Sequence, residues 1–578
     1  MVATLLVWLY TFFLCYVYGS LFFKLLRLTP PRRPFGEGDT PSAALLVVAG
    51  LVVVITLASF LSLFVQTGLF TNLLLLAGAM GAVLARAVPA PRRHPVFLVP
   101  LIVLFFALLL VLENTTHRPL NPDTNLYHAQ AIHWIERFPA VPGLGNLHGR
   151  LAFNSSWFVG NALFSLAFLG LGSFHLTAGV LFLAVLAYFW EGFNDIARGA
   201  YSPAAMLKVF FFPVTFFLLG GEISSPGTDL PTSLLLWLLA VLWAEHAAER
   251  DQPFHPALMA VLAAFVVTIK FSAAPAVLLL ILLPGKLLTA KLAKNTEILR
   301  QPGQNWAIAN FLKPALCVAL VLTPFLARNV VLSGYLLYPF PSIDLFPSSL
   351  LDWKIPLDRA LDEQAAVMAW GRFPRVDAAQ VLAMPFGEWF PRWLSDQTTN
   401  RQWIFWGALL SPLAAVPALW LARRSQAEWR SSGMIALGWL AFYAGTLFWL
   451  FSAPDFRFGY GFLIATIGLA LAPWLAALLK RTIFRPSRVS AVMALMVIAY
   501  LAMAFYSSFE AQTFPSRLLL PAPYDRVATQ RCELANGIVF CAKAYQACGY
   551  ESFPCIPSPR PKVEIRGPGL GDGFRTLP

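Results

Sequence analysis

Long apolar runs separated by short polar segments make up most of the sequence. The clearest of these runs are Val2 to Phe23, Ala43 to Val65, Phe97 to Leu112, Ser233 to Trp243, Ala315 to Phe325 and Val489 to Tyr506. A tilted helix needs about 20 apolar residues to cross about 30 Å of hydrocarbon; several runs are that long, and others need their flanking turns. The pattern predicts an all-α polytopic membrane protein with about 12 to 14 transmembrane helices and with outer juxtamembrane helices.

Composition and charge agree with this prediction. Of the 578 residues, 58% are hydrophobic and only 12% are charged, which is too apolar for a soluble protein of this size. The formal net charge is +13, but the basic residues stand in short clusters between the apolar runs. These clusters are Arg27, Arg32 and Arg33; Arg86, Arg92 and Arg93; Lys286, Lys291 and Lys294; Arg423 and Arg424; and Lys480, Arg481, Arg485 and Arg488. They follow the positive-inside rule, which predicts that they are cytoplasmic and gives little support to nucleic-acid binding.

Alternation of the spans then predicts which segments are on the outer side. They are Met1, residues 113–155, residues 334–402, the turn from Ser452 to Asp455 and the tail after Phe505. The alternation of inner and outer loops fails if both apolar segments between Trp157 and Trp190 are full spans. We therefore expect the segment from Trp157 to Leu171 to be short or re-entrant. The first run lacks a basic n-region and a clear cleavage site, which favours a retained span. The predicted domains are a membrane domain at 1–506 and an extracytoplasmic tail at 507–578.

The six cysteines give an independent indication of the topology. Cys15 and Cys317 lie in apolar runs, where a free cysteine behaves as a small hydrophobic residue. The other four, at spacings of 9, 7 and 7 in the polar tail, are Cys532, Cys541, Cys548 and Cys555. An even set in a short extracytoplasmic segment indicates two disulfides, with three possible pairings. A zinc site is the alternative, but the tail has no Cys-x-x-Cys or histidine ligand spacing.

Few ionisable residues lie at the ends of the apolar runs. On the predicted outer side they are Asp123, Glu222, Asp229, Lys270, Arg328, Asp455 and Arg457. Each is costly in hydrocarbon unless it faces a cavity or a partner. Because they share one side but come from distant parts of the sequence, we expect an outward-facing cavity between the spans to gather them.

The polar stretch NPDTNLYHAQAIHWIERF follows an apolar run. Asn121 suits a helix N-cap and Pro122 suits the first helical position, so we expect a helix with Asp123 in its first turn. This helix is too short and polar to span, and we expect it to lie along the outer surface with Trp134 at the membrane interface. Two interpretations of Asp123 stay open: it favours the helix dipole only, or it belongs to a site.

Histidines are dense in the same region. Four of the eight lie between His117 and His148. His128 and His133 are five residues apart and point to different sides of a helix, which argues against a shared metal. Interfacial packing and a functional loop both remain open as explanations.

Five segments resemble, in chain order, signatures of the GT-C superfamily of membrane glycosyltransferases, such as polyprenyl- or dolichyl-phosphate-sugar-dependent mannosyltransferases and aminoarabinose-transferase-like proteins. They are PDTNLYHAQA with Asp123; SSPGTDLPTSLLLW with Asp229; FVVTIKFSAAPAVLLL with Lys270; TPFLARNVVLSGYLLYPF with Arg328, Asn329, Gly334, Tyr338 and Pro339; and APDFRFGYGFLIATIGLALA with Asp455 and Arg457. The resemblance covers roughly residues 95–480. Family members often have a second acid in the first loop, where Thr124 follows Asp123 here. The stretch HGRLAFNSSWF is more similar to an uncharacterised family of bacterial multi-spanning membrane proteins.

The resemblance implies an enzyme of the bacterial inner or plasma membrane whose active site faces the extracytoplasmic side. It would move a sugar, with inversion, from a polyprenyl-phosphate or polyprenyl-diphosphate donor to a glycan, lipid or protein acceptor. Asp123 would be the catalytic base, and Lys270, Arg328 and Arg457 would bind the donor phosphate. The supporting residues would be Tyr127, His128, Asp229, Asn329, Tyr338 and Asp455. No cofactor is expected; a divalent metal stays open as an alternative that no residue pattern supports.

Other interpretations stay open. For the cations, they are that Arg457 pairs only with Asp455, that Lys270 snorkels from a short span, and that Arg328 anchors at headgroups. For the chain, they are a transporter or flippase, a polymerase or ligase of surface polysaccharide, and a non-catalytic assembly subunit. Transporters usually have inverted repeats, and no clear repeat is visible. In the outer loop 334–402, PFGEWFPRWL predicts an interfacial amphipathic helix.

Overall fold

The computed structural model describes residues 1–26, 28, 41–88, 98–220, 222–248, 256–282, 312–422, 426–481, 486–543 and 547–578. Most of the basic residues assigned to the cytoplasmic side lie outside these ranges. They are Arg27, Arg32, Arg33, Arg92, Arg93, Lys286, Lys291, Lys294, Arg423, Arg424 and Arg485. Their cytoplasmic position stays a prediction.

Apolar helices dominate the described residues. Nine segments there are long and apolar enough to cross a membrane: α1 (Val2–Leu26), α2 (Ala43–Leu61), α7 (Thr177–Ala197), α9 (Asp229–Ala248), α14 (Lys313–Ser333), α18 (Thr399–Leu409) with α19 (Pro412–Ala422), α20 (Gln426–Ser452), α21 (Phe456–Lys480) and α22 (Pro486–Ser508). The shorter apolar helices are α3 (Leu69–Leu84), α4 (Leu98–Thr115), α6 (Ser156–Phe164), α8 (Pro203–Phe217), α10 (Pro256–Ile269), and η5 (Phe271–Ala276) with α11 (Val277–Leu282). The chain is an all-α multi-pass membrane protein, as predicted.

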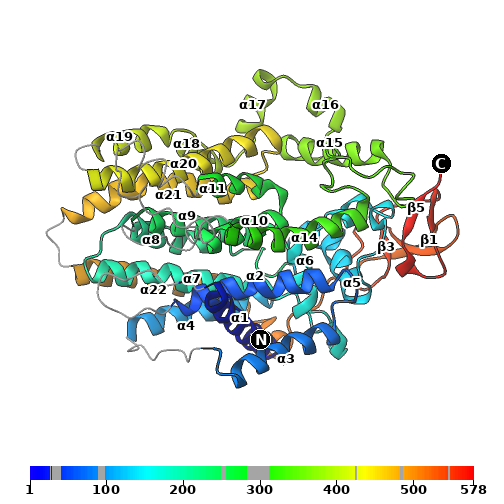
Figure 1. Ribbon diagram of the computed structural model, residues 1–578, viewed down its shortest axis with the longest axis horizontal. Helices are drawn as coiled ribbons and strands as arrows, with labels where there is room; N and C mark the ends of the chain where they lie inside the picture. The colour runs from blue at the N-terminus through cyan, green and yellow to red at the C-terminus, as the bar shows by residue number, and fades with distance from the viewer. Residues whose placement is uncertain are drawn as a thin grey trace.

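Most of these helices run alongside one another (Figure 1). The helix α5 (Ala129–Arg137), the β-strands and the C-terminus lie together at one end of the bundle. That end is called the tail end below. The predicted count of about 12 to 14 spans is larger than the number of long apolar segments in the described residues. It is smaller than the number of long and shorter apolar segments added together.

Two glycines bring α1 and α2 into backbone contact. A Cβ on Gly19 would lie 1.9 Å from the carbonyl oxygen of Leu46, and a Cβ on Gly50 would lie 1.7 Å from that of Cys15. Small residues allow such close crossings in membranes, where van der Waals packing drives helix association. Cys15 and Cys317 are both buried free cysteines, which confirms their predicted packing role.

The segment that follows α5 returns to the tail end. α6 has nine residues, and the chain then turns so that the amide of Phe174 donates to the carbonyl of Ser165 at 3.1 Å. His175, just before α7, forms a hydrogen bond with the hydroxyl of Tyr524 in the tail. The chain therefore enters and leaves this element at the same end, which confirms the predicted short or re-entrant segment.

The loop 334–402 holds three helices, α15 (Leu357–Arg372), α16 (Ala378–Ala383) and α17 (Phe386–Ser395). α17 is the predicted amphipathic helix. Its Trp389 and Trp393 are buried, and Trp393 Nε1 donates to the carbonyl of Pro454 at 3.1 Å. Trp393 therefore joins the loop to the turn between α20 and α21, and neither buried indole faces lipid.

The chain after α22 folds into a small disulfide-bonded unit. Its elements are α23 (Phe514–Arg517), β1 (Thr529–Glu533), β2 (Ile538–Ala542), β3 (Cys555–Ile556), β4 (Val563–Ile565) and β5 (Phe574–Thr576). β2 pairs antiparallel with β1 and parallel with β3, while β4 and β5 form a separate antiparallel pair. The disulfides are Cys532–Cys541 and Cys548–Cys555. They confirm the disulfide interpretation over zinc and select one of the three pairings.

A buried ion pair fastens this tail to the bundle. Nη2 of Arg517 on α23 lies 2.7 Å from Oε1 of Glu113 on α4, and the two side chains are 2% and 1% exposed. We expect Arg517→Met to destabilise the protein by about 3–5 kcal/mol, because the buried carboxylate of Glu113 loses its arginine partner and, among the described residues, keeps only His117 at 3.3 Å. Thermal unfolding in detergent measures the loss.

The matched control is the exposed pair of Arg526 and Glu551, whose side chains are 88% and 57% exposed. Arg526→Met is expected to change stability by no more than about 1 kcal/mol. Adding Glu113→Gln to Arg517→Met should recover part of the loss. Equal melting temperatures for the two single variants would contradict this account of the anchor.

Candidate functional site

A cavity of about 330 Å³ lies among the helices at the tail end. The predicted site residues that line it are Asp123, Tyr127, His128, Asp229, Lys270, Tyr338 and Arg457. Asp455 lies beside it as an ion-pair partner of Arg457. Arg328 and Asn329 are not among its lining residues. This space is called the main cavity below.

Asn121 places Asp123 at the wall of the main cavity. The side-chain oxygen of Asn121 accepts a hydrogen bond from the amide of Asp123 at 2.9 Å, which confirms the predicted helix start. The chain then forms a π-helical turn, η1 (Thr124–His128), and continues as α5. Such turns are rare and occur frequently at functional sites.

The η1–α5 segment is covered by the tail. Trp134 is 2% exposed, and its ring centroid lies 4.8 Å from that of Phe553 and 5.8 Å from that of Phe574. The predicted position of Trp134 at the membrane interface is therefore wrong. An apolar ring needs an apolar cover, and here the C-terminal residues of the same chain supply it.

Two arginines hold the carboxylate of Asp123. Its Oδ2 lies 3.3 Å from Nη1 of Arg457, and its Oδ1 lies 3.8 Å from Nη1 of Arg150. Arg457 also pairs with Asp455 at 3.2 Å, and Arg150 pairs with Glu363 at 3.4 Å. These side chains are only 18–27% exposed, so solvent screens the network less than it screens a surface pair. Arg457 is thus more than the surface partner of Asp455.

Lys270 and Asp229 form a second ion pair in the main cavity. Asp229 opens α9, as predicted, and Lys270 directly follows α10. The ammonium nitrogen lies 3.6 Å from the centroid of the Phe458 ring, which is a cation–π contact. Lys270 therefore faces the cavity and does not snorkel away from it.

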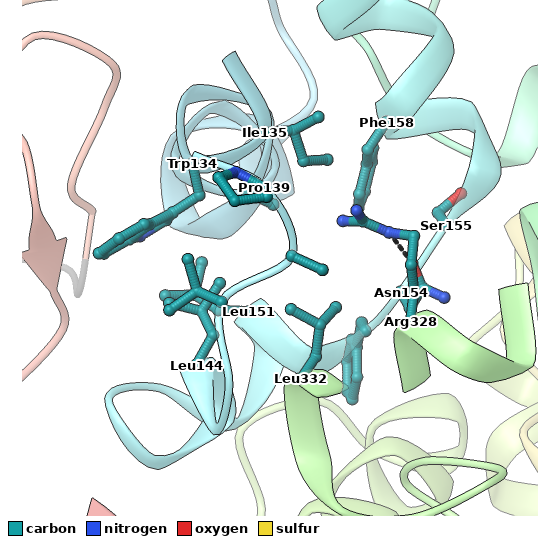
Figure 2. Close-up of a pocket in the computed structure, with 14 residues that line it drawn as sticks. Trp134, Ile135, Pro139, Leu144, Leu151, Asn154, Ser155, Phe158, Arg328 and Leu332 are labelled. Atoms are coloured by element: carbon teal, nitrogen blue, oxygen red, sulfur yellow. Dashed lines mark hydrogen bonds between the residues drawn. The ribbon is translucent and has the colours of Figure 1, made fainter. Parts of the chain in front are cut away.

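Arg328 lines a second, smaller cavity of about 20 Å³ (Figure 2), which adjoins the main cavity at Asn154 and Ser155. Its Nη1 donates to the hydroxyl of Ser62 at 2.8 Å, its Nε donates to the side-chain oxygen of Asn154 at 3.3 Å, and the residue is 3% exposed. Arg328 is therefore not among the residues that line the main cavity with the other cations, and its burial contradicts the headgroup alternative. The face of α14 that carries Arg328 packs against the end of α2 and the loop before α6.

The turn after α14 places Tyr338 in the main cavity. Asn329 is buried and its Nδ2 donates to the carbonyl of Leu336 at 2.9 Å, which holds this turn. Tyr338 packs against Phe153 with ring centroids 6.0 Å apart. Burial raises the pKa of Tyr338, so its hydroxyl is protonated at neutral pH and can donate a hydrogen bond.

Tyr127 and His128 also present neutral polar groups to the main cavity. Burial raises the pKa of Tyr127 and lowers the pKa of His128 to about 4. His133 points elsewhere, with Nδ1 3.0 Å from the carbonyl oxygen of Tyr550, so the two histidines do point apart, as predicted. In the described part of the chain, no group of three or more His, Cys, Asp or Glu side chains is arranged to hold a metal ion.

All residues that line the main cavity lie within the part of the chain that matches a known family. The sequence model of the family described as "Domain of unknown function (DUF8201)" matches residues 1–464 of the 578. The chain belongs to this family. The match ends within α21, so the disulfide-bonded tail of this family member follows the matched residues.

No curated protein matches the sequence. Among solved structures, the chain is similar to ArnT from Cupriavidus metallidurans, whose crystal structure was solved bound to undecaprenyl phosphate. The identity is 14%, the match covers 72% of this chain and 67% of ArnT, and the TM-score is 0.34. A similarity at this TM-score carries no argument about fold or activity.

Three further charged residues near the main cavity are missing from the predicted site. They are Arg150 on η3 (Gly149–Ala152), Glu363 on α15 and Glu222 before α9. The sequence did not mark Arg150 and Glu363 as site residues, because charged residues in loops are usually exposed to solvent. Glu222 was among the ionisable residues predicted to lie on the outer side, but it precedes the segment SSPGTDLPTSLLLW and so had no counterpart in the resemblance.

Glu222 lines a smaller cavity of about 160 Å³ that adjoins the main one. Asp229 and Arg457 line both spaces. Asn121 Nδ2 donates to both carboxylate oxygens of Glu222, at 3.0 and 3.2 Å. Burial, and next the negative charge of Asp229, raises the pKa of Glu222 to about 7. This side chain therefore changes its charge close to neutral pH.

We expect the affinity of these cavities for an anionic ligand to fall as the pH rises through about 7. Glu222 is neutral below that pH and negative above it. One added negative charge opposes an anion by on the order of 1 kcal/mol, which is about a fivefold change in affinity. Binding of a lipid phosphodiester, whose charge is constant, measured at about pH 6 and about pH 8 shows the change.

Glu222→Gln is the matched variant, because glutamine keeps the shape of the side chain and stays neutral. The variant is expected to bind the phosphodiester equally well at both pH values. The same pH dependence in the variant and the wild type would assign the effect to another group.

Proposed function

We propose that the protein is a membrane glycosyltransferase that moves a sugar from a polyprenyl-phosphate or polyprenyl-diphosphate donor to an acceptor of the cell envelope. The observation that carries the proposal is the main cavity, where three cations and the carboxylate of Asp123 surround one space of about 330 Å³. A leaving phosphate needs positive charge, and an acceptor hydroxyl needs a base within reach. Both requirements meet in this cavity.

Arg457, Lys270 and Arg150 are the residues that we assign to the donor phosphate. Each of them is paired with a carboxylate, so an entering phosphate takes over these cations as their new partner. Preorganised cations of this kind need little reorganisation when charge develops in the transition state. Arg150 takes the place of Arg328 in this assignment, because Arg150 lines the main cavity and Arg328 does not.

Asp123 is the base in the proposed step. The acceptor hydroxyl oxygen attacks the anomeric carbon of the sugar, and its proton passes to Asp123. The bond between the anomeric carbon and the phosphate oxygen breaks, and its electron pair stays on the phosphate, where the cations stabilise it. A single displacement inverts the anomeric centre. The hydroxyls of Tyr127 and Tyr338, which line the same space, can donate to sugar oxygens.

Apolar rings form much of the remaining wall of the main cavity. They include Phe271, Phe340, Trp370, Phe448 and Phe458. Such a lining with few polar groups suits a ligand that joins a sugar to an isoprenoid chain. The two disulfides of the tail form in an oxidising compartment, which supports an extracytoplasmic position for the tail end and for the cavity.

Sugar transfer by the purified protein in liposomes tests the proposal. The liposomes carry a panel of sugars linked to polyprenyl phosphate or polyprenyl diphosphate, with a lipid extract of the source organism as acceptor. We expect consumption of one donor and a glycosylated product in the mass spectrum. Movement of an intact donor across the bilayer with no new glycosidic bond would replace the proposal with a flippase. Joining of preformed glycans would replace it with a polymerase or ligase.

A further inference from the structure

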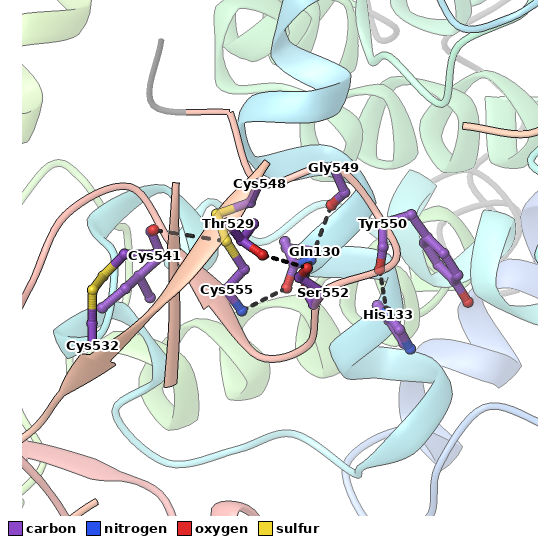
Figure 3. Close-up of a disulfide and its surroundings, with 11 residues drawn as sticks. Gln130, His133, Thr529, Cys532, Cys541, Cys548, Gly549, Tyr550, Ser552 and Cys555 are labelled. Carbon is purple, nitrogen blue, oxygen red and sulfur yellow. Dashed lines mark hydrogen bonds between the residues drawn. A yellow bond between two sulfur atoms is a disulfide. The ribbon is translucent and has the colours of Figure 1, made fainter. Parts of the chain in front are cut away.

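Gln130 joins the η1–α5 segment to the loop 548–555, which a disulfide closes (Figure 3). Its side-chain nitrogen donates to the carbonyls of Gly549 at 2.9 Å and Ser552 at 2.8 Å, and its Oε1 accepts from the amide of Cys555 at 3.1 Å. Gln130 is 1% exposed. Both of its donor hydrogens and its acceptor are thus used by one loop, and truncation would leave buried backbone groups unsatisfied.

Further contacts join the same loop to both parts of the segment. The carbonyl of Asn125 in η1 accepts from two amides of the loop, at 2.8 and 2.9 Å. The ring of His133 stacks on that of Tyr550 with centroids 4.2 Å apart, and the Tyr550 hydroxyl donates to Glu136 at 2.6 Å. The loop therefore holds η1, which lines the main cavity, as well as α5.

The second disulfide makes no comparable contact. Cys532–Cys541 joins β1 to β2, and within the described residues no hydrogen bond links that hairpin to η1 or α5. The tail is also fastened elsewhere: Arg517 pairs with Glu113, and the amide of Phe574 donates to the carbonyl of Pro142 at 2.9 Å. These contacts hold the tail to the bundle without involving the loop 548–555.

We propose that the loop 548–555 is a clamp that fixes the η1–α5 segment, and with it Asp123, and that Gln130 is the positioning residue through which the clamp acts. The disulfide closes the loop into a ring, which limits its conformations. Reduction by a dithiol delivers two electrons and two protons to the S–S bond and converts it into two thiols, while the dithiol becomes a disulfide; the loop is then no longer closed. The hold on the segment is independent of any ligand, whereas its effect on sugar transfer rests on the proposed function.

Hydrogen exchange of the full-length protein in detergent tests the clamp directly. In Cys548→Ser/Cys555→Ser and in Gln130→Ala, we expect amides of residues 124–137 to exchange at least about tenfold faster, while amides of α7 keep their rates. Cys532→Ser/Cys541→Ser is the matched control and is expected to leave residues 124–137 unchanged. Unchanged exchange in the first two variants, or equal acceleration in the control, would overturn the proposal.

Chemical reduction gives a second measurement that does not depend on how the clamp variants fold. In the folded Cys532→Ser/Cys541→Ser protein, dithiothreitol has only the Cys548–Cys555 bond to reduce. We expect the exchange of residues 124–137 to accelerate on reduction and to slow again on reoxidation. No response to verified reduction of this bond would overturn the clamp.

Kinetics separates positioning from mere folding. If the proposed function holds, Gln130→Ala is expected to lower kcat for sugar transfer about tenfold or more with little change in the KM for the donor, because the phosphate-binding cations stay in place. An unchanged kcat would overturn the positioning role. Accelerated exchange together with no transfer by the wild type would uphold the clamp and reject the glycosyltransferase assignment, so the two can fail separately.

Discussion

Asp123→Asn is expected to abolish sugar transfer while the protein still folds and binds its donor. Asparagine keeps the size of the side chain, but it cannot take the proton of the acceptor hydroxyl. Loss of a positioned base lowers kcat by about 10²–10⁴-fold. The variant also frees Arg457 and Arg150 from a negative partner, so donor affinity should hold or rise. Single-turnover transfer and donor binding, measured on the same preparation, check both parts.

Two further variants make this result specific. Asp362→Asn changes an exposed acid on α15 and is expected to leave transfer unchanged. Glu222→Gln changes another carboxylate near the site and is expected to retain turnover at neutral pH. Full activity in Asp123→Asn, with loss in Glu222→Gln, would move the role of base from Asp123 to Glu222.

Gly50→Leu is expected to prevent α1 and α2 from packing. A Cβ at Gly50 would lie 1.7 Å from the backbone oxygen of Cys15. The clash is with backbone and not with the end of a flexible side chain, so the helices must separate and lose contacts along their whole crossing. We expect a loss of more than about 3 kcal/mol of stability, seen as a lower melting temperature in detergent or as failure of the protein to accumulate in membranes.

Gly81→Leu is the matched control for this substitution. Gly81 lies on the neighbouring α3, and no atom comes within 4 Å of the position of its Cβ. We expect a change of no more than about 0.5 kcal/mol. A similar loss of stability in both variants would show that the α1–α2 crossing is not specially tight.

Features with a local cause were predictable from the sequence. The Asn121 cap and the start of α9 at Asp229 depend on a few neighbouring residues, and both are present. The tail cysteines also paired within the tail, at separations of 9 and 7 residues. The gathering of Asp123, Asp229, Lys270 and Arg457 followed from one physical rule, that ionisable groups at the ends of spans need a cavity or each other.

Features decided by tertiary contacts were not predictable. Trp134 needed an apolar cover, and the sequence does not distinguish lipid from the tail. Arg328 and Asn329 are neighbours on α14 and neither lines the main cavity, because the orientation of α14 directs Arg328 towards Ser62 and Asn329 towards the carbonyl of Leu336. The strands of the tail were missed because each has five residues or fewer and gains its order from disulfides and docking.

The most direct test of the central claim is to locate the donor. A cryo-EM structure with a non-cleavable sugar phosphonate on a polyprenyl chain would do so. We expect the phosphonate within hydrogen-bond distance of Lys270 and Arg457, with the anomeric carbon facing Asp123. A headgroup bound elsewhere, with the Lys270–Asp229 and Arg457–Asp123 pairs intact, would contradict the account.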